Sequence, residues 1–140
     1  MYVVINYCAF LAADSFNMVI GFLFYGPVLG NKWKAYMGFT DESMKNMPLT
    51  PIQAIVGGVI ASILIAVVMA HSLVFASYYL SVEGVSAGLQ VGFWNWLGFV
   101  LPVTAGTFLW EGRPLGLWIL NAAYYLVSFL LMGMVLALWV

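Results

Sequence analysis

Asp14 lies in the middle of an apolar stretch long enough to cross a membrane, and it is the clearest candidate for chemistry in this sequence. An ionised carboxylate at the centre of a bilayer costs about 2.5–3.5 kcal/mol on insertion scales, so such an acid is protonated, paired or part of an ion path. Asn6 and Asn17 fall on the same helical face as Asp14. The spacing predicts a polar stripe with two interpretations: a hydrogen bond that fixes helix packing, or a proton or cation site.

The partners of Asp14 can be predicted from the depth of other polar residues within their own apolar segments. Because a helix rises about 1.5 Å per residue, counting from the segment ends places Asn95 and Ser128 near the level of Asp14, with Ser62 close by. We therefore predict a polar core or coupling site made of Asp14, Asn17, Asn95 and Ser128.

The sequence holds one histidine, His71, and one cysteine, Cys8. A lone histidine in a membrane segment can ligate a haem or chlorophyll metal, or relay protons. We interpret His71 as a neutral imidazole bonded to a neighbouring polar group, and keep cofactor binding there as a secondary hypothesis. No nucleophile–base arrangement, phosphate loop or zinc motif is apparent. We therefore predict no enzymatic activity, no cofactor and no metal.

The composition indicates a membrane protein of one small domain. Of the 140 residues, 65% are hydrophobic and 6% are charged, whereas soluble domains carry about 25% charged residues. This balance excludes a soluble globular protein, a disordered chain and a nucleic-acid-binding protein. The expected partner of most of the surface is the lipid bilayer.

Four apolar segments are long enough to span a bilayer, for which about 20 residues suffice. Loop-forming Gly, Pro and charged residues separate the segments. Helices are the expected form, because lipid offers no water to unpaired backbone groups. We predict an all-α membrane protein: a four-transmembrane-helix bundle forming a single domain over residues 1–140, with helices at about 2–25, 52–80, 87–110 and 116–139 and a loop at 26–50.

The loop between the first two segments carries signals for a short interfacial helix. Pro27 suits a helix start, and Gly38 suits a left-handed C-cap. Trp33 and Tyr36 share one side of this helix, which is typical of an aromatic anchor at a membrane surface. Thr40 then resembles the N-cap of a second short helix.

The basic residues predict the orientation of the chain. All of them fall in the loops after the first and third segments, which share one side of a four-span protein: Lys32, Lys34, Lys45 and Arg113. The positive-inside rule puts this side in the cytoplasm. Both termini are then expected on the non-cytoplasmic side of a multi-pass protein.

A set of motifs, taken in order, resembles the DUF1761 family of small bacterial-type integral membrane proteins. These motifs are GFLFYGPVLGNKW at 21–33, MGFTDE at 37–42, FLWEGRP at 108–114, NAAYY at 121–125 and Met132-Gly133. The resemblance implies a four-helix protein, with the bacterial inner membrane as the expected location. It implies no activity, because the family is one of unknown function, and no catalytic residue can be transferred from it.

The resemblance adds weight to two motifs on the predicted cytoplasmic side. One is Tyr25-Gly26-Pro27, and the other contains Glu111 and Arg113 in a tight turn. We expect the two motifs to meet and form one face.

Two functional hypotheses follow. Sparse polar chemistry, short loops and small residues four apart, as at Gly57 and Ala61, favour a non-enzymatic accessory or structural subunit. Such a subunit would pack against itself as a homo-oligomer or against a larger membrane complex. The alternative is a small proton-coupled transporter in which Asp14 is the coupling acid.

Overall fold

The computed structural model describes residues 6–139, and this part of the chain is helical, without strands. The short segments η1 and η2 are single turns of π-helix. The elements in chain order are α1 (Tyr7–Leu23), η1 (Phe24–Val28), α2 (Gly30–Met37), α3 (Asp41–Lys45), α4 (Pro51–Leu80), α5 (Gly84–Asn95), η2 (Trp96–Val100), α6 (Leu101–Thr104), α7 (Gly106–Leu109) and α8 (Leu115–Ala137). The prediction of an all-helical chain of membrane type is confirmed for these residues.

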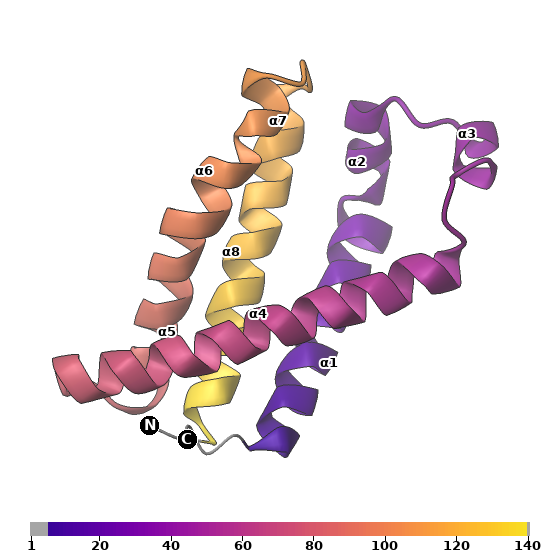
Figure 1. Cartoon of the computed structure of the whole chain (residues 1–140). Helices are drawn as coiled ribbons and strands as arrows, with labels where there is room; N and C mark the ends of the chain where they lie inside the picture. The colour runs from indigo at the N-terminus through magenta and orange to yellow at the C-terminus, as the bar shows by residue number, and fades with distance from the viewer. Residues whose placement is uncertain (1–5, 140) are drawn as a thin grey trace.

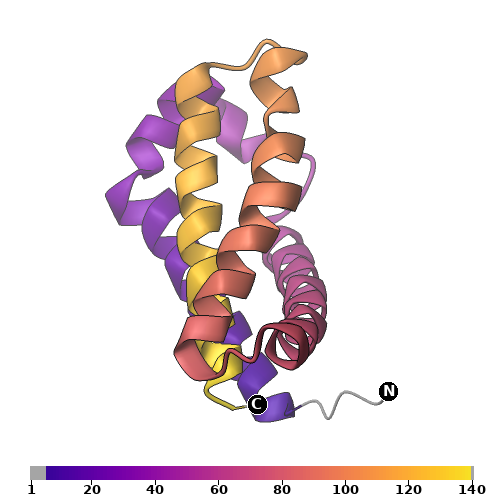
Figure 2. The same ribbon diagram turned by 90° about the vertical axis from the view of Figure 1, so that its left-hand side faces the viewer.

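The helices form three upright columns and one crossing helix (Figure 1). The first column is α1, η1 and α2, the second is α5 to α7, and the third is α8, which packs between the other two. Helix α4 runs across the columns instead of along them, and Figure 2 views it almost end-on. The chain therefore departs from the predicted bundle of four aligned helices.

Close packing of α5 on α8 depends on glycine. A Cβ atom added at Gly88 would overlap the carbonyl oxygen of Gly133, and one added at Gly92 would lie 2.5 Å from the carbonyl oxygen of Phe129. Small residues allow two backbones to approach within the bilayer, where packing drives helix association in the absence of water. The second and third columns are therefore joined backbone to backbone.

The core lies where α4 crosses α1, α5 and α8. Ala13, Ala66, Met69, Met132 and Leu136 are almost fully buried there. Alanine dominates the crossing because a short side chain lets inclined helices touch, and methionine fills the irregular space that the crossing leaves.

Helix α4 is well capped but only partly packed. Thr50 and Gln53 form a reciprocal capping box around Pro51, which occupies the first helical turn. Its buried residues lie in the middle of the helix, from Ser62 to Leu73, whereas its first eleven residues, 51–61, are almost wholly exposed. The crossing therefore uses the middle of α4 and leaves its N-terminal part outside the core.

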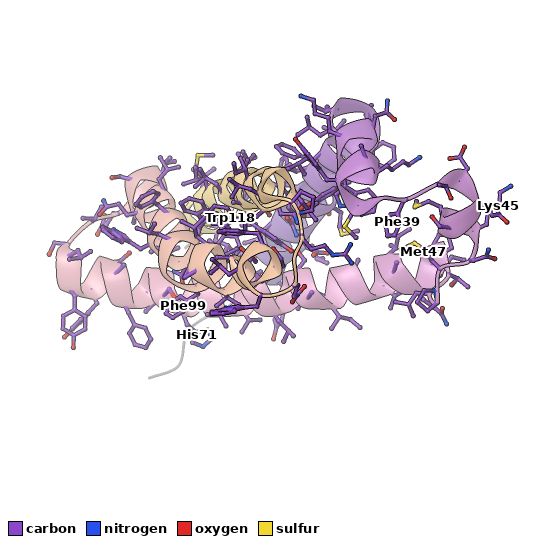
Figure 3. The ribbon with its side chains drawn as sticks, turned by 90° about the horizontal axis from the view of Figure 1, so that it is seen from above. Phe39, Lys45, Met47, His71, Phe99 and Trp118 are labelled. Atoms are coloured by element: carbon purple, nitrogen blue, oxygen red, sulfur yellow. The ribbon has the colours of Figure 1, made fainter. Side chains whose placement is uncertain are left out.

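The third predicted span is broken. Pro102 has no N–H to donate to the carbonyl of Gly98, and the Leu101 N–H instead bonds to the Trp96 carbonyl in the π-turn. The Trp118 indole of α8 donates to the Leu101 carbonyl at 3.4 Å, and Figure 3 shows this side chain between the two columns. Within residues 6–139, three helical stretches are long and apolar enough to cross a membrane: Tyr7–Val28, Pro51–Leu80 and Leu115–Ala137.

The predicted short helix after the first span is α2, and its end is the predicted Gly38, which has φ +69°. A second short helix, α3, begins after Thr40 in a capping box with Ser43. On the aromatic face of α2, Tyr36 lies against Gly116 of α8, so α2 extends the first column and packs on the third. That this face anchors the helix at a membrane surface stays a prediction.

Helix ends elsewhere differ by small amounts from the predicted ones. Asn6 is the N-cap of α1, and its Oδ1 accepts a hydrogen bond from the Cys8 N–H at 3.0 Å. The predicted helical residues 2–5 lie outside the described part of the chain. Helix α8 ends at Ala137, two residues before the predicted end.

Candidate polar and cation sites

Asn17 is the centre of a buried hydrogen-bond network that joins three helices. Its Nδ2 donates to Ser62 Oγ of α4 at 2.8 Å. Its Oδ1 accepts from Ser128 Oγ and, at 3.4 Å, from the Tyr124 hydroxyl, both on α8. Asn17, Ser62 and Ser128 are all at most 8% exposed. The network therefore fixes the point at which α1, α4 and α8 meet.

The chemistry of this network is structural. Both polar ends of the Asn17 amide have partners: Oδ1 accepts from Ser128 and Tyr124, and Nδ2 donates one of its two N–H groups to Ser62. A methyl group at Gly21 would press on the Tyr124 hydroxyl at 3.2 Å, so the glycine makes room for the tyrosine that completes the network. Cross-helix hydrogen bonds in membrane proteins contribute on average about 0.6 kcal/mol each.

Asp14 lies one turn before Asn17 on α1, but it does not join the network. Within the described residues, its Oδ1 is buried and has no hydrogen-bond partner. Asp14 lines a groove of about 320 Å³ between α1 and α4. The other residues lining the groove are Tyr7, Phe10, Leu11, Ile63 and Val67. The buried Oδ1 of this acid is therefore unsatisfied beside a groove whose walls are almost wholly apolar.

Asn95 is separated from both groups. Its Nδ2 donates to the Val91 carbonyl of its own helix at 2.9 Å, and its side chain lines a second cleft, of about 550 Å³, between α4 and the second column. The predicted set of four is therefore divided: Asn17 and Ser128 are bonded to each other, whereas Asp14 and Asn95 line two separate grooves.

His71 is engaged with its own helix. Its Nδ1 lies 2.7 Å from the Val67 carbonyl oxygen, which accepts a hydrogen bond when that nitrogen carries a hydrogen. Figure 3 shows His71 on α4, far from Lys45 at the outer edge of the molecule. Among residues 6–139, no three His, Cys, Asp or Glu side chains are grouped so that they could hold a metal ion.

The Tyr25 motif forms a joint between α1 and α2. The Tyr25 hydroxyl donates to Asn121 Oδ1 of α8 at 2.8 Å, and its ring packs edge-on against that of Tyr124, with the centroids 4.9 Å apart. Gly26 adopts a non-helical conformation (φ −107°, ψ −107°) and Pro27 follows it, so the column bends there. Tyr25 thus attaches the bend to α8.

Glu111 and Arg113 are exposed in the turn between α7 and α8. Gly112 between them has φ +67°, and the Arg113 N–H donates to the Thr107 carbonyl at 3.0 Å. The turn lies at the same end of the molecule as α2 (Figure 1). The Tyr25 motif lies in η1, which precedes α2 and is further from this end, and Tyr25 bonds to Asn121 of α8. That the two motifs meet in one face stays a prediction.

Sequence reasoning did not assign Asn121 and Tyr124 to the polar sites. The signal for both was present, because Asn121, Tyr124 and Ser128 recur at spacings of three and four and therefore lie on one face of α8. That face is the one that meets α1 through Asn17 and Tyr25.

Comparison with known proteins identifies the family of the chain. No curated protein matches it, and no solved structure does. The profile of the family described as "Protein of unknown function (DUF1761)" matches residues 8–137, which is nearly the whole chain and includes every element that forms the two grooves and the network. The resemblance seen in the sequence motifs is confirmed, and the chain belongs to the DUF1761 family.

Proposed function

We propose that this protein is a small proton-coupled membrane transporter in which Asp14 is the coupling acid. The observation that carries the proposal is the buried Asp14 Oδ1, which has no partner among residues 6–139 and belongs to a side chain that lines a groove between α1 and α4. A carboxyl group inside a membrane is neutral when it holds a proton, and it needs a cation when it does not. The group can therefore exchange one for the other.

The packing of α4 supports the proposal that this helix moves during transport. The buried residues of α4 all lie between Ser62 and Leu73, and small residues such as Ala66 and Ala70 are among them. The Asn17–Ser62 bond holds α4 at one point, next to the groove. Rotation of α4 about this point would widen or close the groove at Asp14, which is the change of access that transport requires.

The path of the chain supports four crossings. The segment after α3 and the inclined helix α4 together lead from the end of the molecule at which α2 lies to the end at which α5 begins, and the broken second column carries the chain back (Figure 1). The loops with basic residues share one end, which we place in the cytoplasm of a bacterial inner membrane. Both termini then lie outside the cytoplasm.

Proton movement in proteoliposomes tests the proposal. Gradients of sodium and of tetramethylammonium are imposed in turn, with valinomycin and equal potassium on both sides to hold the membrane potential at zero, and internal pH is followed with a trapped dye. We expect proton movement above that of empty liposomes for the native protein and for Glu111→Gln, in which an exposed acid is removed. Asp14→Asn should fall to the rate of empty liposomes. Equal rates for the native protein and Asp14→Asn would overturn the proposal.

A second candidate function is that of an accessory or self-associating subunit, and a separate observation favours it. The N-terminal half of α4 is apolar and exposed, and nothing lies within 4 Å of a Cβ added at Gly57 or Gly58. Purification from the native membrane in mild detergent, followed by mass spectrometry of the complex, tests this function. A stoichiometric partner or a homo-oligomer would support it, and a monomer without partners would contradict it.

A further inference from the structure

We infer that the cleft between α4 and the second column binds a neutral lipophilic phenol, that is, an apolar molecule with an aromatic ring and one hydroxyl group. The cleft shares no residue with the groove at Asp14, so the inference goes beyond the proposed function and does not depend on it. It joins three features of one place: a cavity of ligand size, an amide that is only partly bonded, and aromatic walls.

The size and lining of the cleft are those of a site for a small apolar ligand. Its volume is about 550 Å³, and ligand sites typically have about 300–1,000 Å³. Such sites are mostly apolar, with a few polar groups that orient the ligand. The nine lining residues follow this pattern: Leu64, Ile65, Val68, Met69, Ser72, Asn95, Phe99, Val100 and Phe129.

The π-turn η2 builds one wall of the cleft. Asn95 is the last residue of α5, and Phe99 and Val100 follow within η2. Because the hydrogen bond of a π-turn spans five residues instead of four, both of them lie about one turn after Asn95, and all three line the cleft. Single π-turns inside α-helices occur frequently at functional sites. The turn therefore places an amide and an aromatic ring on the same wall.

Asn95 supplies the main polar group of the cleft. One N–H of its Nδ2 donates to the Val91 carbonyl at 2.9 Å, which leaves the second N–H and Oδ1 for a ligand. Within residues 6–139, Oδ1 has no hydrogen-bond partner, and unlike Asp14 Oδ1 it is not enclosed. A hydroxyl group matches this amide, because it both donates and accepts. On α4, Ser72 donates to the Val68 carbonyl at 3.0 Å, and its oxygen can accept from the same ligand.

The lining favours a neutral ligand over a charged one. None of the nine residues is Asp, Glu, Lys or Arg. A charged group moved from water into such a cleft would have no partner of opposite charge, and burial of an unpaired charge is far more costly than burial of a hydroxyl group that is hydrogen-bonded.

Aromatic and sulfur-bearing side chains favour a ring next to the hydroxyl group. Phe99 of η2, Phe129 of α8 and Met69 of α4 all line the cleft. Aromatic rings pack well on other rings, and the methionine sulfur makes favourable contacts with ring edges. A phenol can therefore use the amide and the aromatic walls together, whereas a fatty alcohol can use only the amide.

The cleft is open towards the lipid. Leu64 and Val68 are 62% and 58% exposed, and both belong to a helix long and apolar enough to cross a membrane. Phe99 is 73% exposed, and Figure 3 shows it pointing from the second column towards α4. An apolar molecule partitions from water into the bilayer, so it can reach the cleft sideways from the membrane.

4-Hexylphenol and 1-fluoro-4-hexylbenzene form a matched pair of probes. Fluorine is close in size to a hydroxyl group but has no hydrogen to donate. A third probe, 1-decanol, carries a hydroxyl group on a body without a ring. The full-length protein is placed in lipid nanodiscs, and binding of each tritiated probe is measured by equilibrium dialysis, with empty nanodiscs as the baseline.

Two substitutions alter the cleft in different ways. Asn95→Leu removes the amide at similar side-chain size, and Val68→Phe fills part of the cavity from α4. The matched controls make the same changes outside the cleft: Asn31→Leu on the exposed side of α2, and Val56→Phe at a position of α4 that is 54% exposed. Circular dichroism and gel filtration check that each variant is folded.

We expect 4-hexylphenol to bind saturably, and equally, to the native protein and to both controls. Asn95→Leu should weaken this binding about fivefold, because the hydrogen bond to the hydroxyl group is lost. Val68→Phe should weaken it about tenfold, because the added ring overfills the cleft. On the native protein, the fluorinated probe and 1-decanol should each bind about fivefold more weakly than the phenol. The fluorinated probe tests the same hydrogen bond without any substitution, so the test holds even where Asn95→Leu does not fold.

Three results would overturn the inference. The first is no saturable binding of 4-hexylphenol above that of empty nanodiscs. The second is equal binding to Val68→Phe and Val56→Phe, which would place the site elsewhere. The third is equal binding of 4-hexylphenol and either of the other probes, which would leave a cleft that takes any apolar chain. Proton movement in proteoliposomes is a separate measurement, so the phenol site and the transport function can fail independently.

Discussion

Gly88 and Gly133 face each other across α5 and α8 so closely that a methyl group on either would overlap the carbonyl oxygen of the other. The clash is with backbone, which cannot turn away as a flexible side chain can. Helices α5 and α8 therefore meet at a point where neither helix can carry a side chain.

Gly88→Ala is the first prediction from this contact. The added methyl group should push the helices apart and lower the free energy of unfolding by about 1–3 kcal/mol, as measured by titration with a denaturing detergent. Gly58→Ala is the matched control, because nothing lies within 4 Å of a Cβ at that position. Its stability should stay level or rise slightly, since alanine favours helices. A Gly88→Ala protein as stable as Gly58→Ala would show that α5 and α8 do not touch in this way.

Asn17→Ala should remove the side-chain hydrogen bonds that link α1 to α4 and α8. The hydroxyls of Ser62 and Ser128 would lose their partner in a buried position, which costs about 1–3 kcal/mol. The same unfolding measurement checks the loss, and Asn31→Ala on the exposed side of α2 is the control. If the two substitutions have equal effects, the network does not hold the helices.

Tyr25→Phe should loosen the joint between α1 and α2 while its ring packing on Tyr124 is kept. Loss of the bond to Asn121 Oδ1 should cost about 0.5–1.5 kcal/mol. Hydrogen exchange at the amides of α2 should also become faster. Tyr79→Phe serves as control, because that side chain is 80% exposed. If hydrogen exchange at the amides of α2 is unchanged in Tyr25→Phe, the Tyr25 hydroxyl does not stabilise the joint between α1 and α2.

The orientation can be tested with two single cysteines in a Cys8→Ser background. Glu83 and Glu111 are both exposed, in loops at opposite ends of the molecule. A membrane-impermeant maleimide applied to whole spheroplasts should label Glu83→Cys and leave Glu111→Cys unlabelled until the membrane is opened. The reverse labelling pattern would show that the predicted orientation is wrong. Labelling of both cysteines from outside would show that the chain does not cross the membrane between residues 83 and 111.

Features local in sequence could be predicted from it. The left-handed cap at Gly38 and the N-cap at Thr40 depend on side chains within a few residues, so residue type alone reveals them. Counting along the helices places Ser128 near the level of Asp14, and in the structure Ser128 bonds to Asn17, one turn further along α1, so depth is predicted to within about one turn.

Features that depend on how distant segments approach could not be predicted. Asp14 and Asn17 share a face of α1, and a small rotation of this helix decides which of them meets Ser62. The direction of α4 depends on contacts between small residues such as Ala13 and Ala66, which no pattern within α4 encodes. For the same reason, the groove that leaves Asp14 unpaired appears only in three dimensions.

The length of α4 makes this protein sensitive to the mechanics of the bilayer. Its 30 residues extend over about 45 Å at about 1.5 Å per residue, whereas the hydrocarbon layer is about 30 Å thick. A steeply inclined helix accommodates this excess by tilting, so membrane thinning under lateral tension would tilt α4 further about its Asn17–Ser62 contact. The groove at Asp14 is formed between α4 and α1, so its width would change with the thickness of the membrane around it.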